Sequence, residues 1–116
     1  MLDFKVDVAH SDACAVVNVA GELDIATAPQ LVAALDEVRD APKVVVNLLA
    51  TSFIDSTGLT TLFRAHKRTE DQADASFGIV CGPDNIEVRR VMDLMGFNEV
   101  FTLYESLAAA GCETTS

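Results

Sequence analysis

Basic residues are scarce in this sequence. It holds 8 lysines and arginines against 18 aspartates and glutamates, which gives a formal net charge of −10. Proteins that bind DNA or RNA use lysine and arginine to displace the counterions of the phosphate backbone, so this balance argues against a nucleic-acid partner. We therefore expect no direct contact with nucleic acid.

Long apolar runs are absent as well. Half of the residues are hydrophobic, yet no run approaches the length of about 18 apolar residues that a membrane-crossing helix needs. The first residues, MLDFKVDV, lack the basic and apolar regions of a signal peptide. We expect a cytoplasmic protein without a membrane partner.

Cysteines are few and unpaired in their spacing. The sequence contains Cys14, Cys81 and Cys112 and no C-x-x-C pair. An odd number without such a pair indicates neither a disulfide framework nor a zinc site. Cys14 and Cys81 lie in apolar runs and are expected to fill the core, whereas Cys112 lies near the tail, where an exposed thiol could be oxidised.

Signatures of catalysis are also missing. There is no Gly-x-Ser-x-Gly elbow, no Walker A loop and no His-Glu-x-x-His motif. His10 is expected in a turn, and His66 follows Ser56 by ten residues, about 15 Å along a helix and too far to act as its base. We predict a protein that is not an enzyme and needs no cofactor or metal.

The length of 116 residues fits a single domain, 1–116. A chain of this size can bury about two thirds of its unfolded surface and fold without a metal or disulfide. We expect a core over about residues 4–110 and a flexible tail over 112–116.

The first part of the chain predicts two strands and a helix. Apolar and charged residues alternate over 2–8, which indicates an edge strand, and a nearly continuous apolar run over 13–20 indicates a deeper strand that Gly21 ends. The two should pair as a hairpin. A helix is predicted to begin near Thr27, which has capping-box spacing with Gln30.

The rest of the chain alternates between strands and helices. The expected segments are a strand at 44–49, a helix from Ser56, a strand at 76–81, a helix after a capping box at 84–87, a strand at 100–103 and a helix at 105–110. Such alternation implies right-handed crossovers between parallel strands. We predict an α/β fold: a single mixed sheet of about five strands, with an N-terminal hairpin and then parallel strands, covered by about four helices.

The centre of the chain carries the most informative residues. Asp55, Ser56 and Thr57 have short oxygen-bearing side chains that can accept hydrogen bonds at a helix start. A helix N-terminus favours negative charge, so a phosphate on Ser56 would be well placed. Gly58 costs about 1 kcal/mol of helix propensity relative to alanine, and its use is expected to be the close approach of another backbone or another protein.

These residues resemble a known family. The run Asp55–Thr60, together with Gly21-Glu22-Leu23-Asp24 and Thr27-Ala28-Pro29, is similar to the STAS-domain anti-sigma factor antagonists of bacteria, and the resemblance covers about 4–110. It implies the STAS fold and phosphorylation at Ser56, with Thr57 as a secondary candidate. Thr60 departs from the family pattern, which often has a second glycine there.

The resemblance also implies a function. An unphosphorylated antagonist binds an anti-sigma factor that is a serine kinase, releases a sigma factor in a stress response, and is switched off when Ser56 is phosphorylated. A serine/threonine phosphatase of the PP2C type would reverse the modification. The implied partner-binding residues are Asp24, Thr27, Asp55, Ser56, Thr57, Gly58 and Leu59.

Other interpretations are open at this point. Residues 55–57 could simply cap a helix, and Asp24 could be a loop carboxylate that accepts a nearby backbone N–H. The chain could be a STAS interaction module of a stress-signalling complex without direct control of a sigma factor. It could also bind a nucleotide or small ligand, since 57–60 is similar to part of a flavodoxin phosphate loop.

Overall fold

The protein is described by a computed structural model over residues 3–11 and 14–112. Its elements, in order, are β1 (Lys5–His10), β2 (Ala15–Leu23), α1 (Ala28–Glu37), β3 (Lys43–Ile54), α2 (Ser56–Glu70), β4 (Ser76–Val80), α3 (Ile86–Leu94), the 3-10 helix η1 (Phe97–Glu99) and β5 (Thr102–Tyr104). Within these residues, no helix combines the length and apolar character needed to cross a bilayer.

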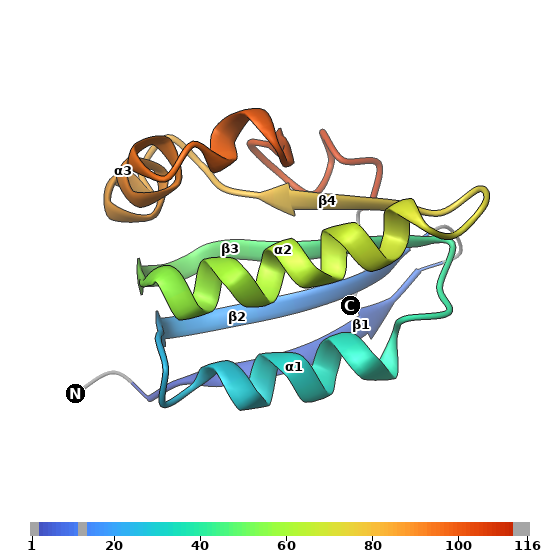
Figure 1. Ribbon diagram of the computed structural model, residues 1–116, viewed down its shortest axis with the longest axis horizontal. Coiled ribbons are helices and arrows are strands. Elements are labelled where there is room, and N and C mark those ends of the chain that lie inside the picture. The colour runs from blue at the N-terminus through green and yellow to red at the C-terminus, as the bar shows by residue number, and fades with distance from the viewer. Residues whose placement is uncertain (1–2, 12–13, 113–116) are drawn as a thin grey trace.

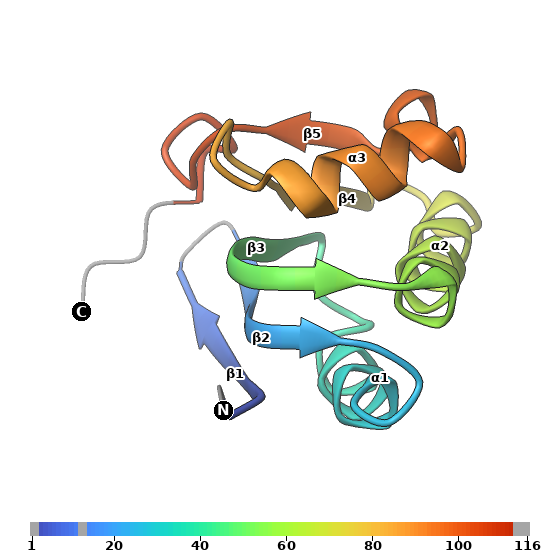
Figure 2. The same cartoon turned by 90° about the vertical axis from the view of Figure 1, so that its left-hand side faces the viewer.

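The five strands form one sheet in the order β1-β2-β3-β4-β5. β1 and β2 are antiparallel, and the other neighbouring pairs are parallel. Helices α1 and α2 lie side by side against one face of the sheet, and α3 lies near the end of β4 (Figures 1 and 2). The predicted mixed α/β sheet, with a hairpin followed by parallel strands, is confirmed.

The second strand continues past Gly21, which was expected to end it. β2 reaches Leu23, and its register against β3 shifts twice, between Asn18 and Ala20 and between Gly21 and Glu22. Gly21 has a φ of +97°, and a Cβ there would lie 3.1 Å from the Asp3 carbonyl oxygen. Gly21 therefore lies at an irregular point within β2, where the segment before β1 approaches its backbone. It does not end the strand.

Over residues 3–11 and 14–112 there are three α-helices, where about four were expected. The segment 105–110, predicted as a last helix, forms turns, and a single 3-10 turn, η1, precedes β5. Alanine-rich sequence favours a helix, but here Ala110 packs against the sheet and Gly111 has a φ of +74°. Packing overrides propensity in this short segment.

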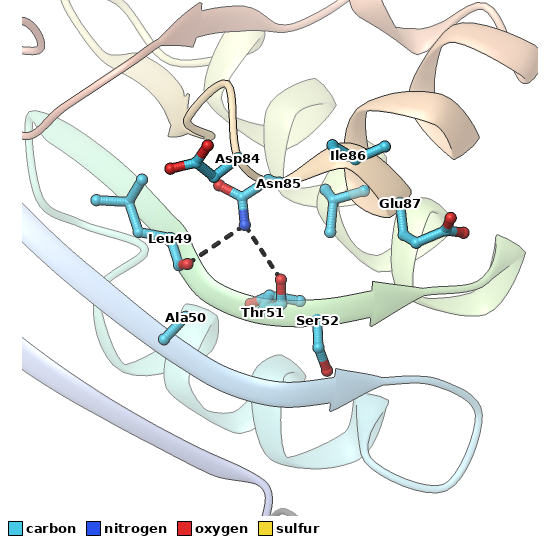
Figure 3. A pocket seen from close by; sticks show the side chains of 9 residues that line it. Leu49, Ala50, Thr51, Ser52, Asp84, Asn85, Ile86 and Glu87 are labelled. Atoms are coloured by element: carbon cyan, nitrogen blue, oxygen red, sulfur yellow. Dashed lines mark hydrogen bonds between the residues drawn. The ribbon is translucent and has the colours of Figure 1, made fainter.

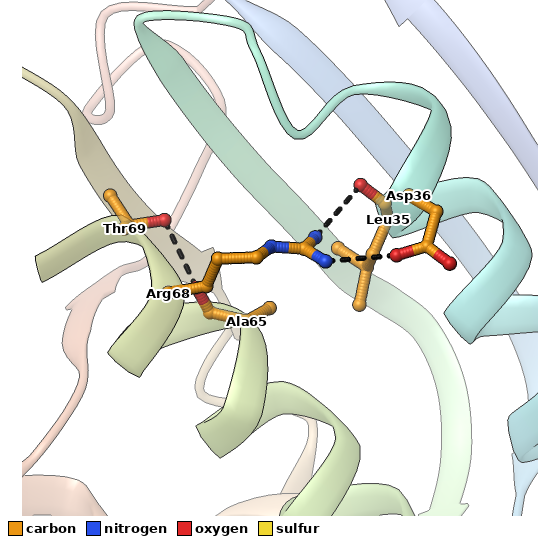
Figure 4. A network of polar contacts seen from close by, with 5 residues as sticks. All are labelled: Leu35, Asp36, Ala65, Arg68 and Thr69. Carbon is orange, nitrogen blue, oxygen red and sulfur yellow. Dashed lines mark hydrogen bonds and ion pairs between the residues drawn. The ribbon is translucent and has the colours of Figure 1, made fainter. Parts of the chain in front are cut away.

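An arginine fastens α2 to the end of α1. Arg68 donates from Nη1 to Asp36 Oδ1 at 2.8 Å and from Nη2 to the Leu35 carbonyl oxygen at 3.1 Å (Figure 4). The second bond satisfies one of the last carbonyl groups of α1, which have no partner inside the helix. Thr69 donates to the Ala65 carbonyl oxygen in the adjacent turn at 3.0 Å.

Apolar side chains fill both faces of the sheet. The larger cluster lies between the sheet and the helices and includes Leu23, Leu31, Ile54, Leu59, Leu62 and Met92. A smaller cluster lies on the opposite face and includes Val16, Val45 and Val80 with the C-terminal segment. The helices pack against the first cluster, and residues 105–112 pack against the second.

The structure corrects two expectations for cysteine. Cys14 and Cys112 form a disulfide that joins residues 98 positions apart, with Cα atoms 5.7 Å apart. Cys112 is buried, so it is neither exposed nor part of a frayed tail. Cys81 is a buried free thiol, as expected. Several predicted positions lie outside the described residues: the strand residues Leu2 and Ala13, the turn residue Asp12 and the tail residues 113–116.

Candidate functional site

Ser56 is exposed at the first residue of α2. The residue before it, Asp55, is the N-cap, and its Oδ1 accepts a hydrogen bond from the Gly58 backbone N–H at 2.9 Å. The side-chain cap that the sequence assigned to residues 55–57 together is thus provided by Asp55. The Ser56 hydroxyl is not needed for this cap, so it can be modified while the helix start is kept.

Asp55 also ties the start of α2 to the loop between β2 and α1. Its second oxygen, Oδ2, accepts from the Ile25 backbone N–H at 3.1 Å, and its own N–H donates to the Leu23 carbonyl oxygen at 3.1 Å. One carboxylate therefore fixes two segments that are 30 residues apart. Such fixed geometry limits the entropy lost when a partner binds.

Asp24 closes the loop between β2 and α1. Its Oδ1 accepts from the backbone N–H groups of Ala26 at 2.9 Å and Thr27 at 3.1 Å. The Thr27 hydroxyl accepts from the Asp24 N–H at 2.9 Å and donates to the Glu22 carbonyl oxygen at 2.8 Å. The loop-carboxylate interpretation of Asp24 is therefore correct as far as local structure goes, and Asp24 is still half-exposed.

The capping box predicted at Thr27 does not form. Thr27 is the residue before α1, but its side chain makes no hydrogen bond to the helix start. Its hydroxyl is used in the preceding loop, with the partners given above. The spacing between Thr27 and Gln30 predicted the helix start correctly. The hydrogen-bond partner that it predicted for the Thr27 hydroxyl was wrong.

Gly58 and Leu59 lie below the surface. A Cβ on Gly58 would be 2.8 Å from Leu23 Cγ and 3.0 Å from the Leu23 carbonyl oxygen. The close approach expected at Gly58 is therefore made by β2 of the same chain. Leu59 is fully buried in the larger core cluster. Neither residue presents a side chain to a partner, so both shape the site from beneath.

Two threonines turn their hydroxyl groups to the backbone of α2. Thr60 donates to the Ser56 carbonyl oxygen at 2.8 Å, and Thr61 donates to the Thr57 carbonyl oxygen at 3.0 Å. Thr60 is exposed, so it adds its methyl group and a partly used hydroxyl next to Ser56. Thr57 is half-buried, which makes it less accessible to a modifying enzyme than Ser56.

An apolar residue in this region was missed by the sequence analysis. The side chain of Ile25 is 73% exposed, although its backbone is held by Asp55. The available signal was an isoleucine in a turn that belongs to neither β2 nor α1. We call the exposed region the Ser56 surface and define it by Asp24, Ile25, Thr27, Asp55, Ser56 and Thr57.

The charge of the Ser56 surface is negative. Asp24 and Asp55 belong to it, and the exposed Glu22 lies beside it at the end of β2. The ion pairs within the described chain use other carboxylates, those of Asp36, Glu70 and Glu87. The carboxylates around Ser56 therefore repel a further negative charge placed among them.

A groove of about 350 Å³ lies between the second half of β3 and the start of α3 (Figure 3). At its base, the buried Asn85 donates from Nδ2 to the carbonyl oxygens of Leu48, at 3.0 Å, and Thr51, at 3.1 Å, and accepts from the Gly82 N–H at 2.7 Å. The carbonyl groups of Leu48 and Thr51 have no partner in β4, because the pairing of β3 with β4 stops at Asn47.

Asn85 therefore acts differently from the prediction. It precedes α3 but makes no side-chain cap bond, so the capping box expected over 84–87 does not form there. Its side-chain amide instead links β3, through the carbonyl oxygens that accept from Nδ2, to the residue Gly82 that follows β4. Because Asn85 already uses its donor and acceptor in these bonds, it offers a ligand in the groove little further hydrogen bonding.

His66 belongs to the apolar side of α2. Its ring meets the rings of Phe77 and Phe101 edge-on, at centroid distances of 6.0 and 5.7 Å. Its Nε2 lies 3.5 Å from Glu70 Oε1, and its Nδ1 is buried with no hydrogen-bond partner among the described residues. Over the same residues, no cluster of three or more His, Cys, Asp or Glu could hold a metal ion.

Comparison with known proteins identifies the fold. A family model of the STAS domain matches residues 5–110. The anti-sigma-F factor antagonist RsfB of Mycobacterium tuberculosis is 34% identical over 104 residues, which cover 88% of this chain and 82% of RsfB. The anti-sigma-B factor antagonist of Staphylococcus aureus is 33% identical, with 84% of this chain and 95% of that protein covered.

A solved structure agrees with these relatives. The crystal structure of an anti-sigma factor antagonist from Mycobacterium paratuberculosis matches with a TM-score of 0.84 and 32% identity, covering 93% of this chain and 91% of that one. The match extends over both the sheet and the helices that carry the Ser56 surface. The chain belongs to the STAS-domain family.

Proposed function

We propose that this protein is an anti-sigma factor antagonist controlled by phosphorylation of Ser56. In the unphosphorylated form, the Ser56 surface binds an anti-sigma factor that is also a serine kinase, and a sigma factor is released. The kinase supplies ATP and the catalytic groups, so this chain is its substrate and its ligand. The names of the relatives from M. tuberculosis and S. aureus support the first part of the proposal.

The position of Ser56 is the observation that carries the proposal. Ser56 is exposed at the start of a 15-residue helix, and Asp55 supplies the cap. Within the described chain, the backbone N–H groups of Ser56 and Thr57 have no acceptor. These groups and the helix dipole can accommodate a phosphate without a change of fold.

Electrostatics explains how the modification would release the partner. A phosphate adds a charge of about −1.5 to −2 beside Asp55 and near Asp24. A partner that fits the unmodified, negative surface would then have to bury like charges together, which costs several kcal/mol. About 3 kcal/mol already weakens binding more than a hundredfold. We infer that release follows from local charge and bulk.

Reversal needs a second enzyme. A phosphatase of the PP2C type would remove the phosphate from Ser56 and restore binding, and all three proteins would act in the cytoplasm. Exposure of Ser56 on a capped helix start gives either enzyme access without unfolding.

The test combines binding and modification. The protein is incubated with candidate anti-sigma kinases and ATP, and the phosphate is located by mass spectrometry. We expect phosphate on Ser56 and none on the Ser56→Ala variant, which should still bind the kinase. Phosphate on Thr57 in that variant would show that the kinase can also modify a second residue of the Ser56 surface.

The other interpretations give different results. A STAS module without control of a sigma factor would bind a partner, yet would not restore transcription by the released sigma factor in a reconstituted assay. A nucleotide or small-ligand binder would show saturable binding in the absence of any kinase. Either result would contradict the proposal.

A further inference from the structure

The face of the sheet opposite α1 and α2 carries a small apolar cluster of its own. Val16, Val45 and Val80 come from three neighbouring strands, β2, β3 and β4, and all three are buried. Among the described residues, no α-helix lies over this face of β2 and β3 (Figure 2). The valines pack with Cys14, Ala9 and Tyr104 and with the segment 105–112, which follows β5.

This covering segment has little structure of its own. It forms turns, held by local hydrogen bonds such as Cys112 N–H to the Leu107 carbonyl oxygen at 2.9 Å. Ala110 and Cys112 are buried against the cluster, and Leu107 is half-buried. Because the backbone hydrogen bonds of this segment are local and those of the strands run across the sheet, the segment opens more readily than the strands beneath it.

Two ties fasten the segment to the rest of the chain. Lys43 Nζ donates to the Ala110 carbonyl oxygen, and the Cys14–Cys112 disulfide joins the segment to the turn between β1 and β2. That turn is held separately, by the Ser11 N–H bond to the Cys14 carbonyl oxygen at 2.8 Å. Loss of the disulfide would leave the segment held by the Lys43 bond and by apolar packing, so residues 105–112 would open more readily.

We propose that Cys14 and Cys112 form a reversible redox switch that decides whether residues 105–112 cover this face of the sheet. Because Cys14 and Cys112 are buried, the segment must open before exchange. A dithiol reductant then attacks one sulfur as a thiolate, forms a mixed disulfide and closes its own disulfide. Both cysteines leave as thiols, and two electrons pass from the dithiol to the protein. A small-molecule disulfide reverses the reaction.

The third cysteine is suited to stay outside the switch. All three cysteines are buried, but Cys81 lies in the larger core cluster, on the other face of the sheet from Cys14 and Cys112. Burial raises the pKa of its thiol, against the opposing charge and hydrogen bond of Arg89. A thiol with a raised pKa holds little thiolate and exchanges slowly. Cys81 thus provides an internal control.

The switch is separate from the Ser56 surface. Val45 lies near the beginning of β3, and Ser56 follows the end of that 12-residue strand. At about 3.3 Å per residue, roughly 30 Å of strand lies between them. The inference therefore goes beyond the proposed function and holds whether or not Ser56 is phosphorylated.

The test compares the oxidised and reduced full-length protein. Oxidation uses a small-molecule disulfide and reduction uses dithiothreitol; thiols are counted by alkylation after denaturation, and hydrogen–deuterium exchange is followed by mass spectrometry. We expect one alkylated cysteine, Cys81, when oxidised and three when reduced. At exchange times too short for global unfolding to contribute, peptides over 105–112 should exchange at least tenfold faster after reduction, with smaller changes in α2.

Two variants sharpen the result. Cys14→Ala/Cys112→Ala should exchange rapidly over 105–112 in both conditions, and Cys81→Ala should respond as the wild type does. Three thiols after oxidation, or protection of 105–112 that changes less than twofold, would overturn the proposal. Equal loss of protection along the whole chain would also overturn it, since the bond would then be a general staple. The wild-type comparison stands even if a variant fails to fold.

Discussion

At one end of the sheet, where β2 and β3 finish, hydrogen bonds hold an exposed, acidic surface in place, with Asp55 bonded to both Gly58 and Ile25. At the other end, a disulfide and a cluster of valines seal a surface that has no α-helix over it in the described chain. The first arrangement keeps polar groups oriented towards solvent, and the second removes apolar groups from it. The comparison separates the Ser56 surface, which a partner protein could bind, from the disulfide and valine cluster, which stabilise the fold.

The largest expected effect concerns the exposed end. Phosphorylation of Ser56 should weaken binding to the anti-sigma kinase more than a hundredfold, or about 3 kcal/mol. Ser56→Asp, with one charge, should weaken it less, and Ser56→Ala should bind as the wild type does. Isothermal titration calorimetry measures all three. A tight complex with the phosphorylated protein would contradict the electrostatic explanation.

Removal of the disulfide tests the sealed end. Cys14→Ala/Cys112→Ala should lower the free energy of unfolding by about 2–4 kcal/mol, because the unfolded chain is no longer closed over a long loop. Urea denaturation measures the change, and wild-type protein in dithiothreitol is the matched control. Unchanged stability in both samples would show that this end does not depend on the bond. Binding to the kinase should stay the same.

Asp55→Ala would break the exposed end. Gly58 N–H and Ile25 N–H both lose their acceptor, and we expect a loss of about 2 kcal/mol in the free energy of unfolding. The neighbouring Ser56→Ala removes an exposed hydroxyl and should change stability by less than about 0.5 kcal/mol. Equal effects of the two substitutions in urea denaturation would disprove the assignment of the cap to Asp55.

Gly58→Ala probes the contact beneath the site. A new Cβ would meet Leu23 Cγ at 2.8 Å and the Leu23 carbonyl oxygen at 3.0 Å. The strain should outweigh the gain in helix propensity and cost about 1–2 kcal/mol in urea denaturation. Thr60→Ala, at an exposed position of the same helix, serves as the control. An increase in stability for Gly58→Ala would show that α2 can move away from β2 at no cost.

Asp24→Ala should have a smaller effect on stability than Asp55→Ala, about 1 kcal/mol, because the N–H groups that Asp24 satisfies are near water. Binding to the kinase should fall more than this stability change suggests, since the loop that carries Ile25 would loosen. Thermal unfolding and titration calorimetry on the same sample compare the two. A collapse of the melting temperature would assign Asp24 to the fold alone.

The sequence alone was sufficient to predict the sheet, its mixed order and the helix start at Ser56. These depend on local apolar patterns and on alternation of strands and helices, which are readable along the chain. Through the family resemblance, it also grouped Asp24, Thr27, Asp55 and Ser56, which the structure brings together with Ser56 exposed. Their role in binding a partner stays a prediction.

The errors arose where distant segments meet. The disulfide joins residues 98 positions apart, and an odd cysteine count gave no sign of it. Gly21 lies within β2, paired with β3, and the close approach of Asp3 explains why a glycine is found there. Residues 105–110 form turns because they pack on the sheet. The capping boxes expected at Thr27 and over 84–87 were also wrong, since the Thr27 hydroxyl bonds to the preceding loop and Asn85, the residue before α3, bonds to β3.

The two bonds of Asp55 have a consequence for protein engineering. Because the same carboxylate holds Ile25 and Gly58, the turn before α1 and the first turn of α2 cannot be redesigned independently. To transplant this docking specificity into another STAS scaffold, segments 22–27 and 55–60 would have to be exchanged together as one cassette. A chimera that receives only one of them should fold and yet fail to discriminate between cognate and foreign kinases.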